Sequence, residues 1–494
     1  CPVGALTSKP YAYNARPWEL RKTETIDVMD AMGAWTRVDV RGTSVPRILP
    51  RVNDEINEEW LSDKSRFVWD GLQRQRLDKP YARVKGKLQP VGWDEALKIA
   101  ADKLSGDAKK IGVIAGDLNA LEDLKAAKDL FTALGVTSID GRQDGAKIGG
   151  GAREEYLFNS TIAGIDEADA ILLVGTNPRL EAPVLNARIR RAWLERGVNV
   201  GVIGENADLT YPTEHLGTGG KALGELGGQS SGFAKVLKDA KKPMIIVGMG
   251  ALTGAGGGKV LRAAGSLASK LGAVTDGWNG FNVLHTAASR VGALDLGFLP
   301  GKGGKDTAGI LKAAAKGDME TVVLMGADEI DMASLGESFV IYIGHHGDAG
   351  AHRADLILPA AAWTEKYGMW VNTEGRVQMN DRALYPKGEA KEDWAIFRAL
   401  SAKLGRTLPY DNLDQLRAKM IADHPVLGGL DHAPGSATAA TFDVANIGVS
   451  GDVADKPFVS PVTDFYQTNV IARASKTMAE CSALKAGPAA QAAE

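Results

Sequence analysis

Two patterns of hydrophobic and polar residues divide the chain near residue 85. Before that point, short stretches alternate between apolar and polar residues, as in Trp35–Arg41, and predict small antiparallel strands with one solvated face. Beyond it, short continuous apolar runs that end in glycine alternate with stretches of helical spacing. The apolar runs predict buried strands within 109–117, 170–175, 198–203, 243–248, 321–326 and 339–344. The helical spacing predicts helices at 93–104, 119–134, 186–196 and 258–271.

This alternation predicts parallel sheets covered by helices on both faces, and we expect two doubly wound α/β units. The 59 glycines suit many tight turns between strands and helices. The Gly/Ser-rich segment 216–232 is expected to be a loop or an interdomain connection. The Ala/Pro/Gln-rich tail from Ala483 is expected to pack loosely.

Composition narrows the function classes. With 494 residues the chain is long enough for two to four domains. Its 58 Lys and Arg against 61 Asp and Glu give a net charge of −3, which argues against a general nucleic-acid binder. Two cysteines exclude a disulfide framework. The apolar runs are much shorter than the ~20 residues of a membrane span. No secretory segment opens the chain, although a targeting segment preceding Cys1 stays open.

The opening Cys1-Pro2 pair is the first candidate for chemistry. Iron–sulfur binding runs often end in a cysteine followed by proline, and a cubane cluster normally needs four thiolates. With Cys1 and Cys481 alone, the chain cannot complete a cluster, so the other ligands of such a site would lie upstream. A trimmed end without a role is the alternative, which composition alone favours. Cys481 lies in a helical pattern and is expected to be a small, partly buried apolar residue.

Two glycine-rich loops invite a phosphate interpretation. Gly248-Met-Gly250 lacks the third glycine of a dinucleotide fingerprint, and 254–259 is not a P-loop, so tight turns are favoured over phosphate binding. The loop that starts at Gly175 opens a helix, and Asn177 is expected to cap it. An anion at that helix start and a simple capped loop are equally weighted interpretations.

Charged and imidazole side chains gather in two later segments. His345, His346 and His352 surround Asp348, but their spacing fits no common ligand pattern, so loop hydrogen bonds are favoured over a metal site. Glu365, Lys366 and Glu374 share one segment and are expected to be solvated. The sequence shows no nucleophile–base set or paired catalytic carboxylates.

Long motifs resemble known families. The segments 1–20 and 62–80 look like the region that follows the last cluster cysteine in the large iron–sulfur subunits of respiratory complex I. GWDEAL at 92–97, together with 175–192 and 354–378, is similar to the molybdopterin oxidoreductase superfamily. HHGDAGAHRAD and the ending ARASKTMAECSAL resemble the complex I family specifically, and the resemblance covers nearly the whole chain.

The resemblance implies an α/β fold with nested doubly wound parallel-sheet domains of the molybdopterin oxidoreductase type and a small, mainly β, N-terminal cluster domain. The expected division starts with the rest of the [4Fe-4S] cluster domain and continues with a discontinuous first α/β domain, an inserted α/β domain and a C-terminal segment. These parts are expected at 1–84, at 85–135 with 240–400, at 136–239 and at 401–494.

The resemblance also implies a function. We expect a peripheral-arm subunit that supports electron transfer from NADH through iron–sulfur clusters to quinone, with no catalytic site of its own. Cys1 matches the last thiolate of a [4Fe-4S] cluster. The stretch 140–149, where active relatives hold molybdenum, has no Cys or Ser; Asp144 is a formal candidate, and no molybdopterin is expected.

Partners and location follow from the same resemblance. The expected partners are other complex I subunits, including the flavin-bearing NADH-oxidising module, with no nucleic acid and no direct membrane insertion. The expected location is the cytoplasmic side of a bacterial inner membrane, or alternatively the matrix side of the mitochondrial inner membrane. The competing hypotheses are an active molybdopterin enzyme, such as a formate dehydrogenase, and a plain nucleotide-binding module.

Overall fold

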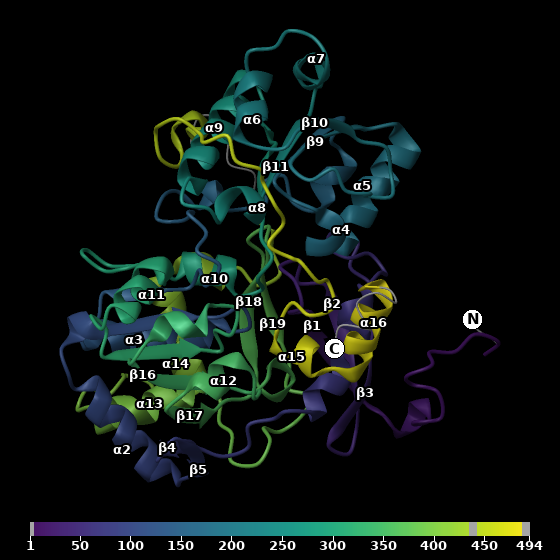
Figure 1. Cartoon of the computed structure of the whole chain (residues 1–494). Coiled ribbons are helices and arrows are strands. Elements are labelled where there is room, and N and C mark those ends of the chain that lie inside the picture. Colours follow the sequence, from purple (N-terminus) through teal and green to yellow (C-terminus); the bar gives the residue numbers. More distant parts are fainter. Residues whose placement is uncertain (1–3, 434–441, 487–494) are drawn as a thin grey trace.

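The computed structural model describes residues 4–433 and 442–486, which form two lobes with a small β unit beside them (Figure 1). The β unit is an antiparallel sheet of β1 (Arg21–Ile26), β2 (Trp35–Arg41) and β3 (Ser44–Pro50). Its central strand coincides with the expected one at 35–41. The lower lobe in Figure 1 contains a seven-stranded sheet and the upper lobe a five-stranded sheet. The predicted fold class, α/β with parallel sheets and a small β region, is therefore confirmed.

The seven-stranded sheet has the order β5-β4-β17-β16-β15-β6-β7. Five strands run parallel, and β4 pairs antiparallel with β17 and β5. Their bounds are β4 (Tyr81–Val84), β5 (Lys87–Pro90), β6 (Ile111–Ala115), β7 (Ser138–Asp140), β15 (Thr321–Met325), β16 (Phe339–Gly344) and β17 (Leu356–Pro359). One face packs against α2 (Trp93–Leu104), α3 (Leu121–Ala133) and α13 (Asp393–Lys403). The other packs against α11 (Thr307–Ala315) and α12 (Ala349–Arg353).

The five-stranded sheet is wholly parallel, with the order β10-β9-β8-β11-β14. Its strands are β8 (Ala170–Val174), β9 (Asn199–Ile203), β10 (Glu214–Gly217), β11 (Pro243–Gly248) and β14 (Phe281–Leu284). One face packs against α5 (Pro183–Arg196). The other packs against α6 (Gly220–Leu226), α7 (Phe233–Asp239) and α9 (Gly257–Lys270). Strands buried on both faces explain why their sequences are continuously apolar.

Shorter elements complete the described fold. The hairpin of β18 (Gly368–Val371) and β19 (Val377–Asn380) and the small pair β12 (Val274–Thr275) and β13 (Trp278–Asn279) lie outside the large sheets. The remaining helices are α1 (Asp63–Phe67), α4 (Pro178–Glu181), α8 (Met249–Leu252), α10 (Arg290–Asp295), α14 (Leu413–Asp423), α15 (Val470–Ala474) and α16 (Lys476–Ala486). Across the described parts, no helix is both long and apolar enough to cross a membrane.

Two sequence expectations differ from this pairing. The Gly/Ser-rich segment 216–232 is not a loop throughout, because β10 ends within it and α6 follows. Strands β11 and β14 lie in the five-stranded sheet, although 240–400 is the range expected for the first α/β domain. The chain thus crosses into the upper lobe after β7 and returns for β15. A buried parallel strand has the same apolar sequence in either sheet, so its sheet cannot be assigned from local pattern.

Candidate functional site

The carboxyl ends of strands from both sheets face one cavity of about 390 Å³, here called the central cavity. From the seven-stranded sheet, the residues that follow β6, β7 and β15 supply Asp117, Gln143 and Glu329. From the five-stranded sheet, the residues after β8 and β14 supply Glu181 and Thr286. Ligands of open α/β sheets bind beyond the carboxyl ends of the strands. The fold therefore places the candidate site here.

Two further parts of the chain close the central cavity. The β unit contributes Met29 and Lys64, and the C-terminal segment contributes Pro461–Asn469 and Arg473. Figure 1 shows this yellow segment running from the upper lobe down to α15 and α16 in the lower part of the molecule. The cavity is thus assembled from segments far apart in the sequence.

Acidic side chains predominate in the lining. Carboxylates outnumber cations: the cavity is lined by Asp117, Asp144, Glu181, Glu329 and Asp464 against Lys64 and Arg473. Burial and the neighbouring Glu329 raise the pKa of Asp117 to about 7, although Arg290 opposes the shift. Burial also raises the pKa of Glu329. The site therefore concentrates negative charge where water is partly excluded.

Hydrogen bonds hold most of these carboxylates in place. Glu329 accepts from Arg473 Nη2 at 2.7 Å and from Gln143 Nε2 at 2.7 Å. Glu181 accepts from the Thr176 hydroxyl at 2.6 Å and the Asn177 backbone N–H at 3.1 Å. The arrangement is well suited to holding a polar ligand, because its acidic groups are fixed before a ligand arrives.

Asp144, the formal metal-ligand candidate, does line the cavity. Its Oδ1 accepts from Arg290 Nη2 at 2.8 Å and from the Ala146 N–H at 3.1 Å. Arg290 is fully buried, so this ion pair anchors the loop that follows β7. Among the described residues no group of His, Cys, Asp and Glu has the geometry to hold a metal ion.

The loop that follows β8 already contains an anion. Asn177 precedes α4, but its side chain makes no capping bond, so the expected cap is wrong. The carboxylate of Glu181 instead accepts from the backbone N–H of Asn177. Burial raises the pKa of Glu181. The interpretation as an anion site therefore loses its basis, because a carboxylate from the same helix occupies the position.

The glycine-rich loop after β11 packs tightly against neighbouring backbone. A Cβ on Gly250 would lie 2.4 Å from the Val459 carbonyl oxygen, and one on Gly248 would lie 2.8 Å from that of Gly175. These contacts fill the space that a phosphate would need. They support tight turns over nucleotide binding.

The histidine-rich loop is held by hydrogen bonds. His345 and His346 are buried and bring their Nδ1 atoms within 2.5 Å of each other, and His346 Nε2 lies 2.9 Å from the Gly71 carbonyl oxygen. Burial lowers the pKa of both rings, so they stay neutral. Asp348 caps α12 and accepts from Arg473, while His352 is exposed. Loop hydrogen bonds, the favoured interpretation, therefore agree with the structure.

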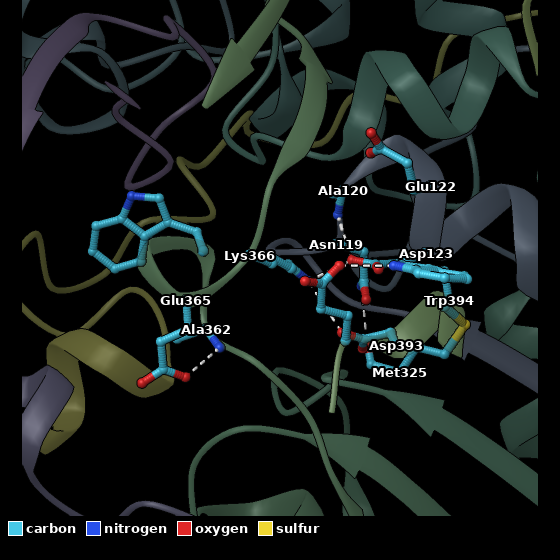
Figure 2. A network of polar contacts seen from close by, with 12 residues as sticks. Asn119, Ala120, Glu122, Asp123, Met325, Ala362, Glu365, Lys366, Asp393 and Trp394 are labelled. Carbon is cyan, nitrogen blue, oxygen red and sulfur yellow. Dashed lines mark hydrogen bonds and ion pairs between the residues drawn. The ribbon is translucent and has the colours of Figure 1, made fainter. Parts of the chain in front are cut away.

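The segment around Glu365 is buried, contrary to the expectation of solvated side chains. Figure 2 shows Lys366 pointing at Asp123 on α3 and Asp393 on α13, and the ammonium pairs with both carboxylates. Glu365 accepts two bonds from Arg76 at 2.6 Å. Burial and Asp123 raise the pKa of Asp393 to about 7, because two carboxylates share one cation. These partners are hundreds of residues away, so local sequence does not reveal them.

Cys1, the proposed cluster ligand, lies outside the described residues. Cys481 lies on α16, partly buried as expected, and burial raises the pKa of its thiol. Sequence reasoning did not single out Asp117, Gln143 or Glu329. A usable signal existed, because Asp117 and Glu329 follow glycine-ended strands whose carboxyl ends meet at one edge.

Three family models match the chain. They are molybdopterin oxidoreductase at 76–403, an NADH-ubiquinone oxidoreductase NDSU1/NuoG-like 4Fe-4S domain at 20–70, and a C-terminal domain of the same NADH-ubiquinone oxidoreductase component at 431–481. The acetylene hydratase of Pelobacter acetylenicus has a similar fold, with a TM-score of 0.61 and 13% identity over 83% of this chain and 72% of that one.

Mitochondrial proteins are similar along nearly the whole chain. The NADH-ubiquinone oxidoreductase 78 kDa subunits of Neurospora crassa and Candida albicans are 45% and 46% identical over 98% and 97% of this chain. The NADH dehydrogenase [ubiquinone] iron-sulfur protein 1 of Solanum tuberosum is 43% identical over 98%. The chain spans 65%, 66% and 64% of the length of these relatives, respectively.

Proposed function

The chain belongs to the molybdopterin oxidoreductase family, and we propose that it works as the large iron–sulfur subunit of an NADH:quinone oxidoreductase of the complex I type. One observation supports this most strongly: 43–46% identity to such subunits runs through the β unit, both lobes and the C-terminal segment. In this proposal the chain supports electron transfer from NADH through iron–sulfur clusters to quinone, alongside the other subunits of a peripheral arm.

The central cavity does not fit a molybdopterin. That cofactor carries phosphate, and the acidic side chains of Asp117, Asp144 and Glu329 would repel it. Molybdenum in this family is also held by a protein ligand such as a thiolate, and no cysteine among the described residues lines the cavity. We therefore infer that the two lobes act as a frame without pterin catalysis. The buried ion pairs of Figure 2 support such a role, because they fix α3, α13 and the segment at Lys366 together.

The cluster proposal concerns Cys1. A [4Fe-4S] cluster passes single electrons and is held by thiolates. The segment matched by the 4Fe-4S domain model, 20–70, contains no cysteine, and the thiol of Cys481 is kept protonated by burial. Cys1 is thus the residue of this chain that we propose as a ligand, with the remaining thiolates supplied from outside it.

The first test uses the intact protein with its clusters. Replacing Cys1 with Ala should remove or perturb one [4Fe-4S] signal in the EPR spectrum and leave the others, whereas Cys481→Ala should change none. An unchanged spectrum of the Cys1→Ala protein would contradict the assignment.

A second test separates the frame from an active molybdopterin enzyme, such as a formate dehydrogenase. The purified complex should contain this chain together with the flavin-bearing NADH-oxidising module, and metal analysis should find no stoichiometric molybdenum or tungsten. Bound molybdenum at one atom per chain would favour the second function. We place the assembled protein on the surface of the membrane that holds the quinone, on the cytoplasmic side in a bacterium or on the matrix side in a mitochondrion.

A further inference from the structure

The central cavity contains a buried acceptor that nothing pairs. Gln143 lines the cavity and is only 5% exposed. Its Nε2 must be the atom that faces Glu329, since a carboxylate only accepts, and this fixes the orientation of the amide. Its Oε1 is left without a donor among the described residues. A buried carbonyl oxygen without a partner costs free energy, which a ligand donor would recover.

Other groups around Gln143 point to the same kind of ligand. Asp144 Oδ2 also has no donor in the described chain, because Arg290 bonds to Oδ1. The cations at the cavity are already engaged: Lys64 donates to the Thr468 hydroxyl at 2.9 Å, and Arg473 pairs with Glu329 and Asp348. The cavity therefore has more acceptors and more negative charge than its own residues satisfy.

We propose that the central cavity binds a small organic cation through an ammonium group, with Gln143, Asp117 and Asp144 as its acceptors. An ammonium carries three N–H donors and one positive charge, which matches three converging oxygen-bearing side chains and an acidic lining. The volume of about 390 Å³ lies within the range of small-molecule pockets. Gln467, which lines the same cavity and has an unpaired Nε2 donor, suits a ligand that also carries a hydroxyl.

A bare metal ion and an anion fit less well. The described residues form no metal-binding group, and the amide and carboxylates are held in place by Glu329 and Arg290 rather than around a common point. A phosphate would face the acidic lining. The proposal does not depend on electron transfer, so it stands or falls separately from the function proposed above.

The experiment measures binding to the full chain by calorimetry and by thermal shift. The probes are aminobutanol, butanediol as its uncharged analogue of equal length, and inorganic phosphate. We expect saturable binding of aminobutanol with a Kd of about 1 mM or tighter. Neither butanediol nor phosphate should bind. Absence of saturable binding by aminobutanol, or equal binding of butanediol, would overturn the proposal.

Matched variants locate the site. Asp117→Asn and Gln143→Leu should each weaken aminobutanol binding by about tenfold or more, which corresponds to the loss of one charged or buried hydrogen bond. The exposed controls Asp276→Asn and Gln229→Leu should leave the Kd unchanged. Because Gln143→Leu also removes a bond to Glu329, the nearly isosteric Asp117→Asn decides the outcome if the other variant does not fold. Equal affinity in Asp117→Asn and wild type would place the cation elsewhere and refute the assignment.

Discussion

The two sheets end in loops of opposite construction. After β8 and β11 of the five-stranded sheet, backbone lies directly on backbone, as where Gly250 meets the Val459 carbonyl. After β6 and β15 of the seven-stranded sheet, buried charged side chains meet, such as Glu329 with Arg473. The first construction leaves no room for a ligand and the second leaves a cavity. The difference teaches that the chemistry retained by this fold lies mainly on the seven-stranded side.

Both constructions depend on the C-terminal segment, which packs by shape against one sheet and by charge against the other. Val459 approaches the glycine loop, and Arg473 pairs with Glu329 and Asp348. The segment therefore connects the lobes through two different kinds of interaction. Substitutions that affect one kind alone test whether the comparison is correct.

The largest effect is expected from Lys366→Met. The substitution leaves Asp123 and Asp393 buried without a cation, and breaking a buried pair in this way typically costs about 3–5 kcal/mol. Urea denaturation of the purified chain measures the loss. The control is Lys98→Met, which removes an exposed pair with Asp102 on α2 and should cost less than about 1 kcal/mol. Equal losses in the two variants would show that the buried network does not hold the lobe together.

A smaller loss is expected from Gly250→Ala, on the other side of the comparison. The added Cβ would lie 2.4 Å from the Val459 carbonyl oxygen and 2.7 Å from that of Gly175, so the backbone must shift. Such overpacking costs about 1–3 kcal/mol. Gly254→Ala is the matched control four residues on, because nothing lies within 4 Å of its added Cβ. Comparable stability of the two variants in urea would mean that the loop is not tightly packed.

How much of this could be read from the sequence differs between the two sheets. Their buried strands follow from continuous apolar runs, and β11 and β16 have the predicted bounds, as does α2. The acidic cavity and the burial of Lys366 could not be predicted, because their partners come from distant segments. Lys366 lies 243 residues from Asp123, and Arg76 lies 289 residues from Glu365. Only the folded chain shows that these charges are paired rather than solvated.

An intermediate effect, dependent on pH, is expected at Asp117. Burial and Glu329 raise its pKa to about 7, and Asp144 adds to the shift while Arg290 and Gln143 oppose it. An acid whose pKa is higher in the folded state binds its proton more tightly there, so its ionisation destabilises the fold as pH rises through about 7. Asp117→Asn should therefore raise Tm by a few degrees at about pH 8 and change it little at about pH 5. A Tm difference that does not vary with pH would show that Asp117 is not the titrating group.

The smallest effect is expected at Asn177, where the two constructions meet. Its side chain makes no capping bond, and Glu181 accepts from its backbone N–H instead. Loss of a working N-cap costs about 1 kcal/mol, whereas Asn177→Ala should change the free energy of unfolding by less than about 0.5 kcal/mol. Glu181→Ala should cost more, because it removes the acceptor of the Thr176 and Ser460 hydroxyls as well. If Asn177→Ala proves the more damaging of the two in urea denaturation, the loop after β8 depends on its own cap, and the Glu181 carboxylate is free to act in the cavity.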